Sequence, residues 1–198
     1  MLAGKDPAVT QADDAVFTVA NQLTLLRMLL IPAFVVLIIE HELGWALAVF
    51  ALAGITDALD GLIARAKGEK TTLGAWLDPM ADKLMFLSAF VVLTLPNLGL
   101  ANKLPIWLTA LVISRDVGIV ATVFIVNLAV GRRTFRPTMF GKLATAVYII
   151  TISFAMLYNY LGYHAVIVDV GIYASLAITF ISGFHYIWHA SRILSEPS

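Results

Sequence analysis

The sequence contains no cysteine and little charge of either sign. Its 13 lysines and arginines are matched by 13 aspartates and glutamates, so the formal net charge at pH 7 is +0. Without cysteine, disulfide bonds and thiolate metal ligands are excluded. A balanced charge gives no support for a nucleic-acid partner. Neither a disulfide framework nor a nucleic-acid interface is therefore predicted.

A secretory leader is also missing from the pattern. The first twenty residues carry Lys5, Asp6, Asp13 and Asp14 and lack the apolar core of about 7 to 15 residues that a signal peptide needs. We therefore expect no cleaved leader and a mature chain that begins at Met1. What the sequence does have is apolar residues: 60% are hydrophobic, 13% are charged, and the mean hydropathy is +0.89. This composition predicts an integral membrane protein.

Apolar stretches close to the ~20 residues that cross a bilayer occur about six times, with short polar joints between them. We predict helices at roughly 22–40, 44–66, 73–95, 105–130, 139–161 and 165–192. Residues 1–20 form a juxtamembrane lead-in, in which Asp6 to Val19 is a short interfacial helix or disordered. No repeat or long linker is visible, so we expect residues 1–198 to form one all-α domain, a bundle of six transmembrane helices.

Basic residues predict how the bundle is oriented. With an even number of crossings both termini share one side of the membrane. That side holds Lys5, Arg27, Arg65, Lys67, Lys70, Arg132, Arg133, Arg136, Lys142 and Arg192. The opposite side keeps Lys103. By the positive-inside rule the termini are cytoplasmic, and we expect the protein in the inner (cytoplasmic) membrane.

Four aspartates interrupt this apolar sequence: Asp57, Asp60, Asp78 and Asp82. An ionised carboxylate at the centre of a membrane helix costs ~3 kcal/mol on insertion scales, so four require compensation on the order of 10 kcal/mol. Divalent metal ions would supply that compensation. The cluster flanks a predicted cytoplasmic loop, which places the expected active site on the cytoplasmic side.

Helical spacing aligns these polar residues in two stripes. One stripe holds Asp57, Asp60, Gly61, Ala64 and Arg65, and the other holds Gly74, Asp78 and Asp82. If the two helices form an antiparallel hairpin, Asp57 lies level with Asp82, Asp60 with Asp78, and Arg65 with Gly74. Four carboxylates suit hard ions such as Mg²⁺ or Mn²⁺, and two ions are expected because four negative charges exceed what one ion neutralises. Two ions about 4 Å apart are a recurring clamp for phosphoryl transfer.

The residues between the aspartates fit a phosphate-bearing ligand. Gly61 and Gly74 leave room for a ligand to approach the backbone. Arg65 can bind a phosphate through two hydrogen bonds.

Together these residues spell DxxDGxxARx8Gx3Dx3D, with each of the fixed positions filled. The chain thus resembles the CDP-alcohol phosphatidyltransferases, membrane enzymes that transfer a phosphatidyl or related group from a CDP-linked donor to an alcohol. Further blocks resemble the glycerol-lipid branch, which contains phosphatidylglycerophosphate synthases and single-signature cardiolipin synthases. These blocks are NQLTLLRMLLIP, LDPMADK, LVISRD and RPTMFGKLATA.

The resemblance implies a role for each position of the motif. Asp57, Asp60 and Asp78 are expected to bind the metal ions, and Asp82 to act as the general base while also contacting an ion. The cytidine diphosphate pocket is expected to contain Gly61, Arg65 and Gly74. The implied donor is CDP-diacylglycerol, the implied acceptor is glycerol 3-phosphate or phosphatidylglycerol, and the implied assembly is a homodimer in membrane lipid.

Cations outside the motif are candidates for the acceptor phosphate. We expect Arg115, Lys142 and Arg136 to form this pocket, because the first two lie toward the cytoplasmic ends of their helices and Arg136 lies in the basic loop. Arg27 lies about one and a half turns inside the first helix, which is costly unless it faces a phosphate or an acid. Arg27 is therefore a further candidate for lining the donor site.

Two other classes of protein remain as alternatives. A divalent-cation transporter also places carboxylates in a bundle, but it favours ligands near the midplane and related halves of sequence. A non-catalytic membrane scaffold has no reason to bury aspartates, although Lys83 and Arg115 offer a purely structural pairing for them.

Overall fold

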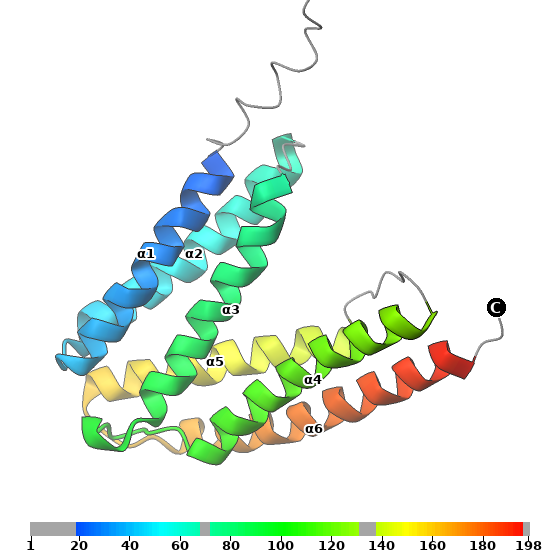
Figure 1. The fold of residues 1–198 in the computed structure, drawn as a ribbon. Helices are drawn as coiled ribbons and strands as arrows, with labels where there is room; N and C mark the ends of the chain where they lie inside the picture. Colours follow the sequence, from blue (N-terminus) through cyan, green and yellow to red (C-terminus); the bar gives the residue numbers. More distant parts are fainter. Residues whose placement is uncertain (1–18, 68–71, 131–137, 196–198) are drawn as a thin grey trace, which may run out of the picture. The chain divides into compact units, whose positions relative to one another are not determined.

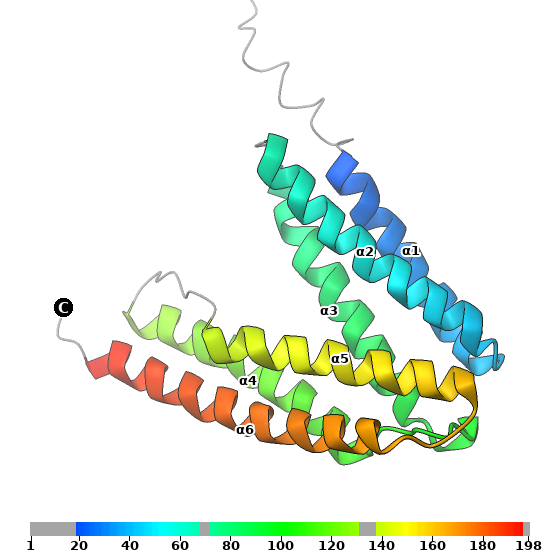
Figure 2. The same cartoon turned by 180° about the vertical axis from the view of Figure 1, so that it is seen from behind.

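A computed structural model describes residues 19–67, 72–130 and 138–195 (Figures 1 and 2). Only the backbone is described at 19–21, 58, 60–67, 72–79, 82, 127, 129–130, 189–190 and 192–195. All regular structure in the described residues is helical. The elements are α1 (Val19–Ile39), α2 (Leu43–Lys67), α3 (Thr72–Thr94), the short 3₁₀ helix η2 (Pro96–Leu98), α4 (Ile106–Val130), α5 (Met139–Leu161) and α6 (Val166–Ser195).

The all-α prediction is confirmed, and each expected helix is present with its ends shifted by three residues or fewer. Four helices are long and apolar enough to cross a membrane, namely those over Gln22–Ile39, Ile106–Val126, Met139–Leu161 and Val166–Trp188. The described parts of α2 and α3 contain shorter apolar segments, Leu43–Asp57 and Lys83–Thr94. A crossing by these two helices stays a prediction, and the interfacial segment at 6–19 lies almost wholly outside the described residues.

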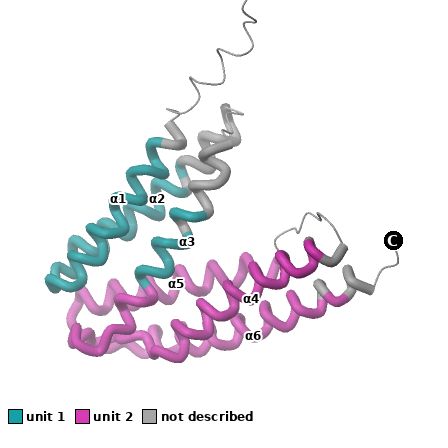
Figure 3. Tube along the Cα trace, in the orientation of Figure 1, with its two compact units in different colours: residues 1–89 teal, residues 90–198 magenta. Residues whose placement is uncertain are grey.

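The chain divides into two compact units, Met1–Ala89 and Phe90–Ser198, here called unit 1 and unit 2 (Figure 3). The boundary falls within α3. Compact units of this kind can belong to one domain, so the expected single domain stays a prediction.

In unit 1, α1 packs along α2 (Figures 1 and 2). Phe34 of α1 and Phe50 of α2 are buried with their ring centroids 5.8 Å apart. Ala46 and Ala53 are buried on the same helix as Phe50, and such small residues let membrane helices approach closely. His41 makes the sharp turn between the two helices with a φ of 59°. This packing fixes the position of α2 against α1.

In unit 2, α6 packs against both α4 and α5 (Figures 1 and 2). A pair of buried asparagines joins the ends of these helices. The Asn102 backbone N–H donates to Asn159 Oδ1 at 2.7 Å, and the Ala165 N–H donates to Asn102 Oδ1 at 2.9 Å. The loop before α4 is thereby tied to the end of α5 and the start of α6. Consequently α4 and α6 begin at the same end of the unit.

Large apolar side chains cover the outside of the helices. Leu29, Phe124, Leu128, Val166 and Phe184 are each more than 60% exposed. A water-soluble protein rarely shows so much contiguous apolar surface, whereas lipid-facing helices require it. The described helices therefore support an integral membrane protein.

Candidate functional site

The four aspartates lie on the two helices that the sequence predicts for them. Asp57 and Asp60 are in α2, and Asp78 and Asp82 are in α3. Their helical spacing therefore holds, and each pair shares a stripe of its helix. The side chains of Asp60, Asp78 and Asp82 lie outside the described ones, as do those of Arg65 and the glycines at 61 and 74. The pairing of the two stripes stays a prediction.

Asp57 is the motif residue whose side chain is described. Its Oδ1 lies 3.1 Å from Nη1 of Arg27, which reaches across from α1. The Arg27 side chain is 1% exposed, whereas that of Asp57 is 48% exposed. The ion pair therefore gives the buried guanidinium a carboxylate partner and leaves much of that carboxylate accessible to a further ligand.

This pairing answers the question that the sequence raised about Arg27. A cation so far inside an apolar helix was expected to face a phosphate or an acid, and it faces the first acid of the motif. Thr24, one turn before it on α1, is also fully buried. Helix α1 therefore contributes Arg27 to the region around Asp57, and it packs on α2 within unit 1.

The residues present fit a divalent cation chemically. Asp57 offers an accessible carboxylate, and Asp60 follows it by one helical turn on the same stripe of α2. Carboxylate oxygens are the ligands that Mg²⁺ and Mn²⁺ prefer. Because the Asp57 side chain is 48% exposed beside its contact with Arg27, its carboxylate remains accessible to an ion.

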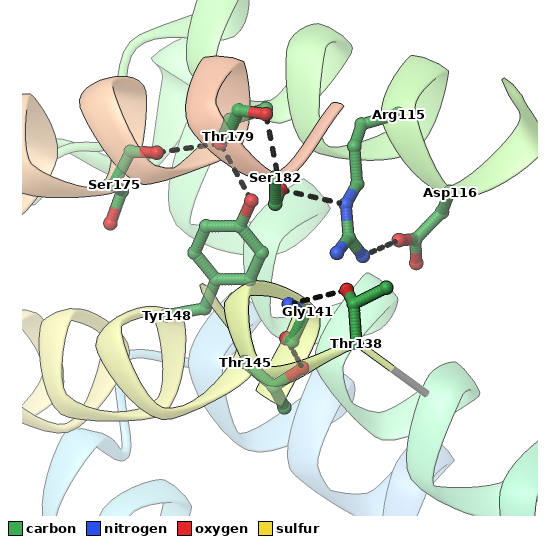
Figure 4. A network of polar contacts seen from close by, with 9 residues as sticks. All are labelled: Arg115, Asp116, Thr138, Gly141, Thr145, Tyr148, Ser175, Thr179 and Ser182. Atoms are coloured by element: carbon green, nitrogen blue, oxygen red, sulfur yellow. Dashed lines mark hydrogen bonds and ion pairs between the residues drawn. The ribbon is translucent and has the colours of Figure 1, made fainter. Parts of the chain in front are cut away.

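Arg115 is the centre of a second polar cluster, in unit 2 (Figure 4). Its Nε donates to Ser182 Oγ of α6 at 3.3 Å, and its Nη1 donates to Asp116 Oδ1 at 2.9 Å. A Cβ added at Gly141 of α5 would lie 3.3 Å from Nη2. The Arg115 side chain thus extends from α4, hydrogen-bonds to Ser182 of α6, and ends close to the first turn of α5.

The start of α5 is itself well defined. Thr138 caps the helix by accepting a hydrogen bond from the Gly141 N–H at 3.1 Å. Lys142, next to Gly141, has an exposed side chain. The structure therefore brings Arg115 close to the segment that carries Lys142, while an acceptor pocket formed by the two stays a prediction. Arg136 lies outside the described residues.

The carboxylate beside Arg115 is Asp116, and both lie in unit 2. The alternative of a purely structural pairing of the four aspartates with Lys83 and Arg115 stays untested, because the side chains of Asp60, Asp78 and Asp82 lie outside the described ones. Sequence reasoning missed Ser182 altogether. Serine is common in membrane helices, so the only signal for Ser182 was that it shares a face of α6 with Ser175 and Thr179.

Behind Arg115, hydroxyl groups continue the cluster into the core of unit 2 (Figure 4). The Tyr148 hydroxyl and Thr179 Oγ1 are 2.6 Å apart, and Thr179 Oγ1 donates to the Ser175 carbonyl at 2.5 Å. Ser182 Oγ donates to the Thr179 carbonyl at 3.1 Å. Arg115 therefore rests on a fixed layer of polar groups that joins α5 to α6.

Comparison with known proteins decides between the classes that this geometry allows. Residues 17–181 match the family model of the CDP-alcohol phosphatidyltransferases. The chain belongs to this family. The match includes α1 to α5 and about half of α6, so it contains the four aspartates, Arg27 and Arg115 and ends one residue before Ser182.

Individual relatives agree. The chain is 37% identical to human cardiolipin synthase (CMP-forming) over 163 residues, which are 73% of this chain and 52% of the relative. It is 36% identical to a probable phosphatidylglycerophosphate synthase of Mycobacterium tuberculosis over 182 residues, 87% of this chain and 81% of the relative. It is 37% identical to cardiolipin synthase (CMP-forming) of Streptomyces coelicolor over 141 residues, 67% of this chain and 61% of that relative. The chain spans about half the length of the human relative.

These relatives are enzymes of phospholipid synthesis by their names, and the family is one of transferases. Membership in it is consistent with the apolar helices of both units.

Proposed function

We propose that this chain transfers a phosphatidyl group from CDP-diacylglycerol to a glycerol-type alcohol and releases CMP. The observation that carries the proposal is the placement of the aspartate motif on α2 and α3 within a chain that matches the phosphatidyltransferase family. The proposed acceptor is glycerol 3-phosphate or phosphatidylglycerol, and relatives named cardiolipin synthase and probable phosphatidylglycerophosphate synthase support a glycerol-type alcohol. Either product is an anionic phospholipid.

The proposed metal ligands are Asp57, Asp60, Asp78 and Asp82, which would hold two Mg²⁺ or Mn²⁺ ions. When bound, the ions would offset the negative charge of the diphosphate and of the departing CMP. Arg27 keeps one oxygen of Asp57 in place from the side of α1. Gly61, Arg65 and Gly74 are proposed to receive the cytidine diphosphate.

The chemical step is a displacement at phosphorus. The acceptor hydroxyl oxygen forms a bond to the phosphorus that carries the diacylglycerol group. The bond from this phosphorus to the bridging oxygen of CMP breaks, and CMP leaves with the electron pair. Asp82 takes the proton of the attacking hydroxyl, since an alcohol is a poor nucleophile until that proton is removed.

Arg115 is proposed to bind the phosphate of the acceptor, together with Lys142 and Arg136. Two of its three nitrogens are oriented by Ser182 and Asp116, and the third lies against Gly141. A guanidinium held in this way loses little conformational freedom when it binds a phosphate. The distribution of basic residues supports a cytoplasmic active site, and a homodimer is the proposed assembly.

The test is release of CMP. The protein in lipid nanodiscs is incubated with labelled CDP-diacylglycerol, Mg²⁺ and either glycerol 3-phosphate or phosphatidylglycerol. We expect CMP and a new phospholipid with at least one acceptor, and loss of both after chelation of the metal. Mg²⁺ should also raise the midpoint of thermal unfolding in the absence of substrates, which reports binding apart from turnover. A divalent-cation transporter would instead move Mg²⁺ into liposomes without forming CMP, and that result would reject the proposal.

A further inference from the structure

A groove with a cavity volume of about 310 Å³ runs between α4 and α6 of unit 2. Ligand pockets range from about 300 to 1,000 Å³, so its size is that of a small ligand or of part of a larger one. Most of its lining is apolar and includes Leu111, Ile119, Phe180, Phe184 and Ile187.

Two glycines on facing helices keep this groove open. Gly118 of α4 and Gly183 of α6 both line it, and a Cβ added at either would meet nothing within 4 Å. A side chain introduced at either position would therefore start in open space. The groove thus depends on the absence of two side chains.

The hydroxyl groups of the two threonines along the groove are bonded within the protein. Thr122 Oγ1 donates to the Gly118 carbonyl at 2.7 Å. Thr179 Oγ1 donates to the Ser175 carbonyl and contacts the Tyr148 hydroxyl. Because both threonine hydroxyls already donate hydrogen bonds within the protein, they need none from a ligand. The part of the groove that they line can therefore contact hydrocarbon.

Arg115 connects the groove with the proposed acceptor pocket. Its side chain lines the groove, passes Ser182 of α6, and ends with Nη2 against Gly141 of α5. Because Arg115 also lines the groove, a ligand that places a phosphate on this side chain can extend its neighbouring atoms into the groove. The groove offers such a ligand an apolar surface and the guanidinium offers it a positive charge.

A helix of another chain does not fit the volume. An α-helix about 10 Å across occupies on the order of 120 Å³ per residue, so the groove holds the equivalent of fewer than about three helical residues. A single acyl chain is far narrower than a helix. A hydrocarbon chain attached to a phosphate also complements both the apolar lining of the groove and the positive charge of Arg115. A purely apolar partner would complement the lining alone.

We propose that the α4–α6 groove binds an acyl chain of the acceptor, and that the acceptor is therefore a phospholipid with a glycerol headgroup, such as phosphatidylglycerol. This inference rests on the proposed function and narrows it, because glycerol 3-phosphate has no acyl chain. The groove selects the acceptor, and Arg115 holds its phosphate.

Filling the groove tests the proposal. Gly118→Leu and Gly183→Leu are each compared with wild type, using long-chain phosphatidylglycerol and its deacylated headgroup, glycerophosphoglycerol, as acceptors. We expect either variant to lower kcat/KM for the long-chain lipid about tenfold or more, and to leave kcat/KM for the headgroup and the KM for CDP-diacylglycerol within about twofold. Ala121→Leu is the matched control, since it enlarges a side chain on an exposed part of α4 that does not line the groove.

The outcomes separate this inference from the function beneath it. No CMP from any acceptor would reject the proposed function. CMP formation with glycerol 3-phosphate that exceeds the rate with phosphatidylglycerol, unchanged in both leucine variants, would keep the function and overturn the groove. A raised KM for CDP-diacylglycerol in those variants would also overturn it, because the acyl chain in the groove would then belong to the donor.

Because the leucine variants could fold poorly, a binding measurement on the wild-type protein provides a second test. Wild-type protein is photolabelled with phosphatidylglycerol that carries a diazirine in one acyl chain, and the labelled peptides are mapped by mass spectrometry. We expect labels at Phe180 and Phe184, displaced by excess phosphatidylglycerol but not by phosphatidylcholine. Equal displacement by both lipids would mean that the groove holds bulk lipid, which contradicts the proposal.

Discussion

Unit 1 and unit 2 differ in how their buried polar groups are satisfied. In unit 2 neutral hydroxyls bond to one another and to backbone carbonyls, as Tyr148 and Thr179 do. In unit 1 the buried Arg27 faces a half-exposed carboxylate, and the motif adds three more aspartates on α2 and α3. Neutral hydroxyls need no further ligand, whereas grouped carboxylates in an apolar helix pair need added positive charge.

The difference suggests a division of labour. In unit 2 the hydroxyls of Thr179 and Ser182 have partners within the protein, so this polar layer can hold Arg115 in a fixed position for a ligand phosphate. Unit 1 is suited to receive charge, as a metal-dependent centre requires. The following changes test this contrast, in order of expected effect.

The largest effect is expected from Asp82→Asn in unit 1. Asparagine keeps the shape of the side chain but cannot accept the proton of the acceptor hydroxyl. We expect kcat to fall by about 10² to 10⁴ while the Mg²⁺-induced rise in thermal stability is largely retained. The measurements are CMP release and thermal unfolding with and without Mg²⁺.

Asp169→Asn provides the matched control for that change. Asp169 lies on α6, is 44% exposed, and pairs with His164 at 3.5 Å, apart from both clusters. The Asp169→Asn enzyme should release CMP at the wild-type rate. An Asp82→Asn enzyme with a rate near wild type would show that another group takes the proton.

The next effect is expected from Arg115→Lys in unit 2. Lysine keeps the charge but cannot reach Ser182, Asp116 and a phosphate with one planar group. We expect the KM for the acceptor to rise about 10- to 100-fold, which corresponds to the ~1.5–3 kcal/mol of a hydrogen bond to a charged group. The KM for CDP-diacylglycerol should stay constant in the same assays. A parallel rise of both constants would argue that Arg115 serves the fold and not the acceptor.

The fold could be predicted closely because polar joints interrupt the apolar runs at nearly every helix end, as Asn102 and Lys103 do before α4. The positions of the aspartates on α2 and α3 followed from helical spacing. The Arg27–Asp57 pair could be anticipated only in part. A cation inside an apolar helix predicts an acidic partner, but the choice of Asp57 depends on how α1 packs on α2, which spacing within one helix does not encode.

The same limit applies more strongly in unit 2. Nothing in the periodicity of α4 or α6 indicates that Arg115 contacts Ser182, because this contact depends on the relative rotation of the two helices. The asparagine clasp between Asn102 and Asn159 likewise joins a loop to a helix that is 57 residues away. Such cross-helix polar pairs require the tertiary structure.

A smaller effect is expected from separating Arg27 and Asp57 in unit 1. In a double-mutant cycle with Arg27→Gln and Asp57→Asn, we expect a coupling free energy of about 1–2 kcal/mol. The value lies below that of a fully buried pair because Asp57 is 48% exposed and solvent screens its charge. Unfolding of the four proteins in mixed detergent micelles measures it. Additive effects of the two substitutions would mean that the pair does not stabilise the packing of α1 on α2.

The smallest effect is expected from Tyr148→Phe in the hydroxyl layer of unit 2. The change removes the contact of 2.6 Å with Thr179, while Thr179 keeps its bond to the Ser175 carbonyl, so no buried donor loses its last partner. Hydrogen bonds between membrane helices average about 0.6 kcal/mol, and we expect a loss of about 0.5–1 kcal/mol in the free energy of unfolding. Tyr160→Phe on the same helix is the control, because Tyr160 is 57% exposed and should leave stability unchanged. A loss above about 2 kcal/mol for Tyr148→Phe would show that the layer is strongly cooperative and that unit 2, like unit 1, depends on a costly polar centre.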